Sequence, residues 1–172
     1  MSDSIRLISS RISLAFLLLL ASCLPLLAVD IPTEHVFVFE RSTNANYVCY
    51  DINLNNGHLC QNQPLDAYWV IGKGARTERL TFFDRRMAFG VKVVSTGEDE
   101  AVVHLTAYKS LTIRVCRRDG KWVGIVRWNG HEMVLRKMFA QMGGAFGTKC
   151  EYVDVCGIDT QTGQTHSERI YP

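Results

Sequence analysis

From residue 35 onward, hydrophobic and polar residues alternate along the chain with a period of two residues. Such a period places alternate side chains on opposite faces of a β-strand. Two shorter segments, 36–39 and 67–71, are apolar throughout, which is typical of strands covered on both faces. The pattern therefore predicts a protein built mainly of β-strands. The alternation is clearest in segments 48–54, 111–116 and 121–128.

Short turn sequences separate the predicted strands. Asn56-Gly57, Asp119-Gly120 and Asn129-Gly130 are typical of two-residue hairpins, because both central residues of such a turn adopt positive φ. A longer hairpin loop is predicted over 159–164. We therefore expect one antiparallel, strongly twisted sheet of about eight or nine strands, closed or nearly closed into a small barrel.

One segment departs from the alternation. Thr81 and Asp84 resemble a capping box, in which two side chains satisfy backbone groups at the start of a helix. Phe83 and Met87 lie four residues apart and would share one helical face. We predict a short helix over 78–88 that lies at one end of the barrel or across the sheet.

The first 28 residues have the pattern of a secretory signal peptide. Two arginines, Arg6 and Arg11, precede an apolar run over 12–22. The remaining residues, 29–172, are then expected to form a single β domain. Alternatively, the uncharged run over 12–29 is about long enough to anchor the chain in a membrane.

Two cleavage sites compete within this leader. Leu20-Ala-Ser-Cys23 matches a bacterial lipobox, in which Cys23 becomes the lipidated N-terminus. Cleavage after Ala28 would instead leave Val29 as the first residue. Both outcomes predict an exported protein that is periplasmic, extracellular or lipid-anchored to the envelope. Contact with a membrane is expected only through lipidation of Cys23.

Five cysteines follow the leader, and an exported protein meets oxidising conditions that permit disulfides. The candidates are Cys49, Cys60, Cys116, Cys150 and Cys156. They allow at most two bridges and leave one thiol, with the pairing open. A bridge between Cys150 and Cys156 is disfavoured, because one extended strand would hold them about 20 Å apart.

Neither the cysteines nor the histidines have the spacing of a zinc site. No Cys-x2-Cys occurs, and no two histidines are separated by three to five residues. His58 and His131 each follow an Asn-Gly turn and are expected to be exposed at hairpin ends. We therefore predict no metal and no cofactor.

The chain has 172 residues and a formal net charge of +2. This length fits one domain and excludes a large multidomain enzyme. A balance so close to neutral does not favour nucleic acid as a partner, because phosphate binding needs a marked excess of Lys and Arg.

Three segments, taken in order, resemble a known family. They are Arg41-Ser-Thr-Asn-Ala-Asn46 followed by Tyr50-Asp51, then Pro64-Leu-Asp-Ala-Tyr-Trp69, and then Met87-Ala-Phe-Gly-Val-Lys92. The chain is similar, over most of 36–171, to exported bacterial proteins grouped as domain-of-unknown-function family 4833. The cysteines after the leader depart from the family pattern, so we interpret them as local stabilisers. The resemblance implies an exported single domain and no particular activity.

The best candidate for ligand binding is the segment from Arg41 to Asn46. Arg41, Ser42, Asn44 and Asn46 place several hydrogen-bonding side chains between two strands. Tyr68 and Trp69, together with Trp122 and Trp128, could supply the aromatic wall that ligand pockets commonly have. Alternatively, the asparagines only shape the turn and the tryptophans fill the core.

A second candidate site consists of two carboxylates. Asp51 and Asp66 each lie in an apolar or aromatic strand, and two carboxylates that face one cavity can perform acid–base catalysis. Alternatively, each pairs with an arginine or caps a turn. The nucleophile elbow, the phosphate-binding loop and the His-Glu-x2-His motif are all missing from the sequence.

Three functions are compatible with these features. The first hypothesis is a non-enzymatic binding domain for a small molecule, a glycan or an envelope component. The second is a secreted hydrolase that uses Asp51 and Asp66, which an open cleft between the two carboxyl groups would favour. The third is an envelope scaffold that binds another protein through a free apolar sheet edge within 145–172.

Overall fold

The computed structural model describes residues 35–172 except 73, 75 and 172. The predicted signal peptide, both cleavage sites and Cys23 lie outside the described residues. Within the described part, no helix is long and apolar enough to cross a membrane.

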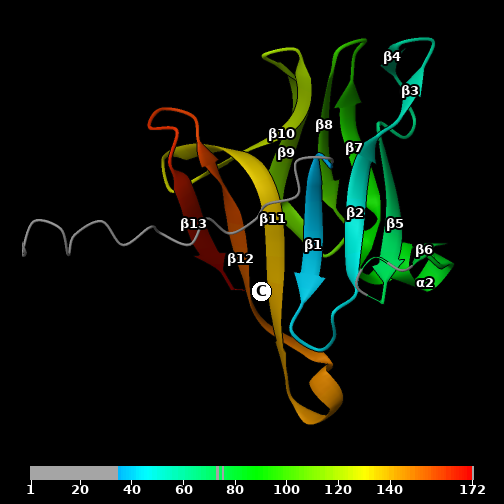
Figure 1. The fold of residues 1–172 in the computed structure, drawn as a ribbon, viewed down its shortest axis with the longest axis vertical. Helices are drawn as coiled ribbons and strands as arrows, with labels where there is room; N and C mark the ends of the chain where they lie inside the picture. The colour runs from blue at the N-terminus through cyan, green and yellow to red at the C-terminus, as the bar shows by residue number, and fades with distance from the viewer. Residues whose placement is uncertain (1–34, 73, 75, 172) are drawn as a thin grey trace, which may run out of the picture. The chain divides into compact units, whose positions relative to one another are not determined.

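The described residues form thirteen strands and three short helical turns (Figure 1). The strands are β1 (Phe37–Arg41), β2 (Tyr47–Ile52), β3 (Leu54–Asn55), β4 (His58–Leu59), β5 (Leu65–Ile71), β6 (Arg76–Arg79), β7 (Val91–Thr96), β8 (Glu100–Leu105), β9 (Tyr108–Arg118), β10 (Lys121–Trp128), β11 (His131–Gly143), β12 (Lys149–Asp159) and β13 (Thr165–Ile170). The helical turns are α2 (Phe82–Asp84), a π-helical turn (Arg85–Phe89) and a 3-10 turn (Ala145–Gly147). The protein is therefore mainly β, as predicted.

Strand β11 organises the main sheet, since it pairs with three other strands. One edge of β11 pairs with β12 along most of its length. On the other edge, the first half pairs with β10 and the second half pairs with β1. A bulge at Arg136 separates the two halves. Two runs of hydrogen-bonded strands, here called arms, therefore extend from one edge of β11. The first arm consists of β1, β2, β5 and β6, and the second arm consists of β10, β9, β8 and β7.

The structure corrects two features of the predicted sheet. Strand β1 runs parallel to β11, so the sheet is mixed and not purely antiparallel. The sheet is also not closed, because β6 and β7, the two ends of the strand order, do not pair with each other. It curls as a half-barrel. The connection from β6 to β7 is the helical segment Phe82–Phe89, which takes the place of a closing pair.

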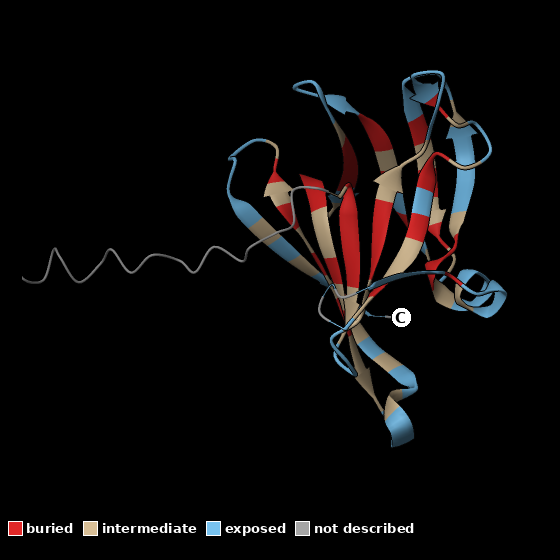
Figure 2. Ribbon diagram, turned by 45° about the vertical axis from the view of Figure 1, so that its right-hand side comes forward, coloured by how far each residue is buried: buried red, intermediate tan, exposed pale blue. Residues whose placement is uncertain are grey.

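Buried residues follow the strands of both arms (Figure 2). Side chains from both arms form one hydrophobic cluster on the inner face of the curled sheet. Phe37 in the first arm is fully buried and stacks on Tyr50, with ring centroids 4.2 Å apart. The Tyr50 hydroxyl donates a 3.0 Å hydrogen bond to the carbonyl of Phe89, so this buried polar group is satisfied. Ile113 and Val115 are among the residues that the second arm contributes to this cluster.

The hairpin turns agree with their sequence signals. Asn56-Gly57, Asp119-Gly120 and Asn129-Gly130 all have positive φ at both residues. They join the strands expected of them, β3 to β4, β9 to β10 and β10 to β11. Local turn chemistry was therefore sufficient to predict these three connections.

The predicted helix exists but is shorter than expected, because its first residues belong to β6. The capping box is formed: Thr81 Oγ1 accepts from the Asp84 backbone, and the Asp84 carboxylate accepts from the Thr81 backbone. The π-helical turn follows directly and ends at Gly90. Thr106 then fixes the turn, since its hydroxyl donates to the carbonyls of Arg85 and Gly90.

Gly90→Ala is expected to destabilise the domain. A Cβ at this position would overlap the carbonyl oxygen of Arg85 and lie 2.8 Å from Thr106 Oγ1. Because backbone atoms cannot move aside cheaply, we expect the free energy of unfolding to fall by about 2 kcal/mol. Urea unfolding measures the loss. Gly97→Ala is the control, since its Cβ would have no neighbour closer than 3.6 Å, and an equal loss in both variants would contradict this explanation.

The five cysteines of the described part are free thiols, which corrects the prediction of disulfides. They belong to separate regions of the fold. Cys49 packs with Val38 and Val70 on the outer face of the first arm, and Cys116 packs with Val123 in a different outer cluster. Burial raises the pKa of Cys49 to about 12, with the nearby Asp51 charge adding to the rise, so this thiol is inert at neutral pH. The remaining thiols are Cys60, Cys150 and Cys156.

Candidate functional site

A pocket of about 380 Å³ lies where the π-helical turn meets the end of β1. This volume is in the range of small-molecule sites. Parts of β1, β9, β11 and β12 complete its wall. The pocket thus combines segments from both arms and from the C-terminal half of the chain.

Aromatic rings form much of the pocket's inner wall. Phe39 meets Phe89 edge to face at 5.3 Å and stacks on Tyr108 at 5.8 Å between ring centroids. Trp69 supports this wall from behind, with its ring 5.0 Å from that of Phe89. Met142 adds a flexible apolar side chain from β11. Such a surface would cover the apolar body of a ligand.

Arg41 carries the only guanidinium among the residues that line this pocket. Its Cζ lies 4.9 Å from the centroid of the Trp69 ring and 5.5 Å from that of Phe89, which are cation–π distances. Its Nε is shielded from solvent and has no hydrogen-bond partner among the described residues. Burial lowers the pKa of Arg41, and the charge of Asp84 opposes this shift. A guanidinium nevertheless stays charged at neutral pH.

Asp84 balances the charge of Arg41 but is itself engaged by hydrogen bonds. Its carboxylate accepts from the Thr81 backbone at 3.0 Å, the Thr81 hydroxyl at 2.7 Å and Trp69 Nε1 at 3.2 Å. Burial alone would raise the pKa of Asp84, but these hydrogen bonds and the charge of Arg41 together lower it. Asp84 therefore remains an anion that fixes Trp69 beside Arg41.

Cys150 and Tyr108 provide further polar atoms of the pocket. The Tyr108 hydroxyl lies 3.3 Å from Cys150 Sγ, and burial raises the pKa of Tyr108, with the Cys150 contact adding to the rise. No histidine is among the described residues that line the pocket, so the thiol has no base beside it.

Two of the apolar side chains that line the pocket are largely exposed to solvent. Phe83 is 73% exposed and Met87 is 70% exposed, and both line the pocket. They lie four residues apart and on one side of the helical segment, as their spacing predicted. Large apolar side chains exposed together are typical of a surface that receives a partner or ligand.

The structure separates the predicted ligand-binding residues into two groups. Arg41 and Trp69 lie together at the pocket. Ser42, Asn44 and Asn46 instead hold the backbone: Ser42 Oγ accepts from Met142 N, Asn44 Oδ1 accepts from Asn46 N, and Asn46 Oδ1 accepts from Gly72 N. These bonds match the alternative in which this segment shapes a turn.

Three further aromatic candidates lie away from the pocket. Tyr68 is on the opposite face of β5 from Trp69 and packs beside Cys49. Trp122 and Trp128 pack partly buried against the core, and Arg117 lies 4.9 Å above the Trp122 ring. These two tryptophans thus agree with the alternative in which they fill the core.

Asp51 and Asp66 lie directly opposite each other on β2 and β5. Both carboxylates are engaged on the outer face of the first arm. Asp51 contacts His35 Nδ1 at 2.7 Å and accepts from the Tyr68 hydroxyl at 2.5 Å, while Asp66 accepts from Gln63. They line different surface hollows. Their contacts fit a structural role that ties neighbouring segments together.

The free edge at the C-terminal end of the sheet is polar. Strand β13 exposes Thr165, Ser167 and Arg169, and Arg169 makes a bidentate ion pair with Asp154 at 2.7 and 3.0 Å. Charged and polar edges discourage strand addition. This edge therefore lacks the apolar character that the scaffold hypothesis requires.

Several pocket residues had no signal in the sequence as ligand contacts. Phe89, Tyr108, Met142 and Cys150 come from four different elements, and only the folded sheet brings them together. Asp84 was recognisable in the sequence as part of a capping box. That motif predicts the start of a helix, and it does not predict the contact between Asp84 and Trp69.

Of the comparisons with known proteins, one finds a match. No curated protein and no solved structure matches the chain. A family model described as a domain of unknown function, DUF4833, matches residues 37–169. This match covers most of the chain, from β1 to β13, and agrees with the resemblance carried by the three sequence segments. The chain belongs to the DUF4833 family.

Proposed function

We propose that this protein is a non-enzymatic binding domain whose pocket takes a small amphipathic carboxylate. One observation carries the proposal: the Arg41 guanidinium faces an aromatic pocket, and its shielded Nε has no acceptor among the described residues. A buried donor without a partner costs free energy. A ligand that supplies an acceptor would recover that cost.

The chemistry of the pocket selects the ligand class. A guanidinium matches a carboxylate in shape and charge, with two parallel hydrogen bonds. Asp84 does not fill this role: its Oδ2 already accepts from Thr81 and Trp69, and the carboxylate forms no ion pair with Arg41 among the described residues. The apolar body of the ligand would lie against Phe39, Phe89 and Met142, with Phe83 and Met87 at the entrance.

Decanoate is a suitable probe, with decanol as its uncharged counterpart of equal chain length. We expect one equivalent of decanoate to bind in isothermal titration calorimetry, at least about tenfold more tightly than decanol, because only the carboxylate pairs with Arg41. Equal affinity for the two would overturn the carboxylate assignment. Failure of both compounds to bind would overturn the proposal that this pocket is a ligand-binding site.

The proposal includes export of the domain, supported by the arginines and apolar run of the leader. Disulfides would have been further support for export, but the five cysteines of the described part are free thiols. Intact mass of the protein made from its precursor in a bacterial host tests the point. A product starting at Cys23 with acyl chains, or at Val29, is expected, and a product that retains residues 1–22 would contradict cleavage of the leader.

A further inference from the structure

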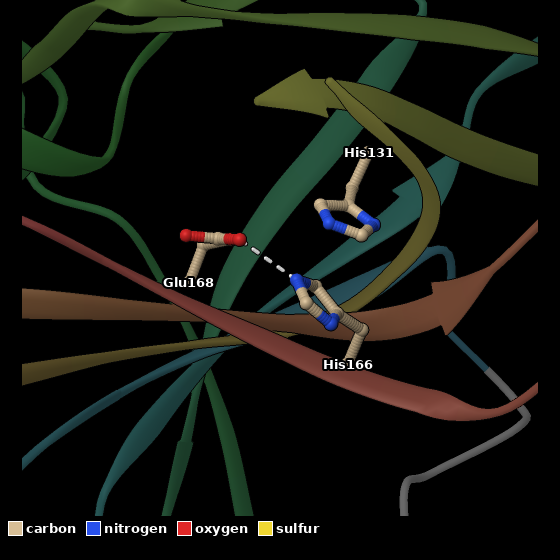
Figure 3. A group of neighbouring side chains, drawn as sticks. All are labelled: His131, His166 and Glu168. Carbon is tan, nitrogen blue, oxygen red and sulfur yellow. Dashed lines mark hydrogen bonds and ion pairs between the residues drawn. The ribbon is translucent and has the colours of Figure 1, made fainter. Parts of the chain in front are cut away.

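Three potential metal ligands converge on the inner face of the sheet, away from the pocket (Figure 3). His131 begins β11, and His166 and Glu168 lie two residues apart on β13, so they share one face. One ligand atom from each side chain lies within 4.8 Å of the other two. The His131 and His166 rings are close and nearly parallel, with centroids 4.2 Å apart.

Asp159 orients His131 from behind. Its carboxylate lies 3.0 Å from His131 Nδ1 and is held by the backbone N–H groups of Gln161 and Thr162. An anion at this position places the proton of a neutral imidazole on Nδ1, which leaves the Nε2 lone pair free. A carboxylate behind a histidine is the usual support of a metal-binding imidazole.

Hydrogen bonds also orient the side chains of Glu168 and His166. Glu168 Oε2 accepts from Asn129 Nδ2 at 3.0 Å, which leaves Oε1 directed at His166 Nε2, 2.8 Å away. Figure 3 shows the Glu168 carboxylate and the His166 nitrogen facing each other, with the His131 ring beside them.

We propose that His131 Nε2, His166 Nε2 and Glu168 Oε1 bind one zinc ion and leave its fourth position open to solvent or to an anion. Two imidazoles and one carboxylate are a common zinc ligand set with an open position. Glu168 and Asp159 also give the site two negative charges. Zinc takes the place of the proton between His166 Nε2 and Glu168 Oε1, and that proton moves to Nδ1 of His166 or to solvent.

The distances require only a small closure of the site. Ligand atoms of a tetrahedral zinc ion are about 3.3 Å apart, given zinc–nitrogen bonds of about 2.0–2.1 Å. The largest separation here is at most 4.8 Å. The His131 side chain is 46% exposed, so it can rotate toward the ion without displacing the core.

This proposal replaces the sequence-based expectation that the chain has no metal site. That expectation rested on ligand spacing within single segments, whereas these ligands come from β11 and β13. Since β13 is an edge strand paired only with β12, a zinc ion would tie it to the start of β11. Binding to the folded state alone would stabilise the domain by mass action.

Zinc titration against a chromogenic chelator tests the proposal, with full-length protein that carries no histidine tag. We expect one equivalent to bind and to raise the midpoint of thermal unfolding. His166→Ala and Glu168→Gln should each lower the affinity at least about tenfold, and Asp159→Asn should lower it about tenfold to a hundredfold through His131. His58→Ala is the control, because His58 is exposed outside the cluster and should bind zinc like the unmodified protein.

Two outcomes would overturn the site. The first is unchanged zinc affinity in Glu168→Gln, a variant of nearly identical shape that should fold even if His166→Ala does not. The second is a sulfur-to-metal charge-transfer band when cobalt(II) replaces zinc. That band would assign the binding to the free thiols instead of the imidazoles.

Discussion

Arg41→Met is expected to weaken decanoate binding about tenfold to a hundredfold, because the substitution removes a charge-assisted hydrogen-bond pair worth about 1.5–3 kcal/mol. Methionine keeps an apolar side chain of similar length against Trp69 and Phe89, so the wall of the pocket should persist. Decanol binding should therefore change little. Calorimetric titration of both ligands into the same variant separates the loss of charge from the loss of shape.

Arg117→Met is the matched control for this prediction. Arg117 also lies over a tryptophan, at the same 4.9 Å as Arg41 over Trp69, but it is outside the pocket. Its substitution should leave decanoate affinity unchanged. Unchanged binding in Arg41→Met, or an equal loss in Arg117→Met, would show that Arg41 does not receive the carboxylate.

Phe37→Ala is expected to lower the free energy of unfolding by about 3–5 kcal/mol. Phe37 is fully buried, stacks on Tyr50 and reaches the second arm, where a Cβ at Gly124 would lie 3.7 Å from its ring. Truncation would leave a cavity between the two arms that the sheet cannot easily fill. Because domains of this size are only marginally stable, such a loss approaches complete unfolding.

Phe83→Ala provides the comparison for this second prediction. The same atoms are removed, but Phe83 is 73% exposed, so the free energy of unfolding should change by no more than about 0.5 kcal/mol. Urea unfolding of both variants gives the difference directly. Similar stability losses would contradict the placement of β1 inside the core and of the helical segment outside it.

The features that the sequence predicted correctly are all local. Three Asn-Gly or Asp-Gly pairs predicted their hairpins, since φ preference acts within a turn, and Thr81 with Asp84 predicted a capping box. The predicted purely antiparallel barrel was wrong for a non-local reason. Strand β1 pairs with β11, from the opposite end of the domain, and no short-range pattern encodes the direction of such a pair.

The candidate sites show the same division between local and distant contacts. Arg41 and Trp69 stood out in the sequence as a basic and an aromatic residue, and they meet because β1, β2 and β5 are neighbours. Their neighbours Phe89, Tyr108 and Cys150 could not be identified from the sequence as pocket residues, because a residue of this kind in an apolar strand or turn is usually part of the core. His131 and His166 likewise come together only across the curled sheet.

The most direct test of the pocket as a binding site is the alkylation rate of Cys150 with and without decanoate, followed by peptide mass spectrometry. Cys150 lines the pocket, whereas Cys156 contacts Ser167 outside it and serves as the internal reference. At ten times the decanoate Kd, Cys150 should react about tenfold more slowly, because only unoccupied protein exposes the thiol. Cys156 should react at an unchanged rate. Equal rates for Cys150 with and without decanoate would contradict the account.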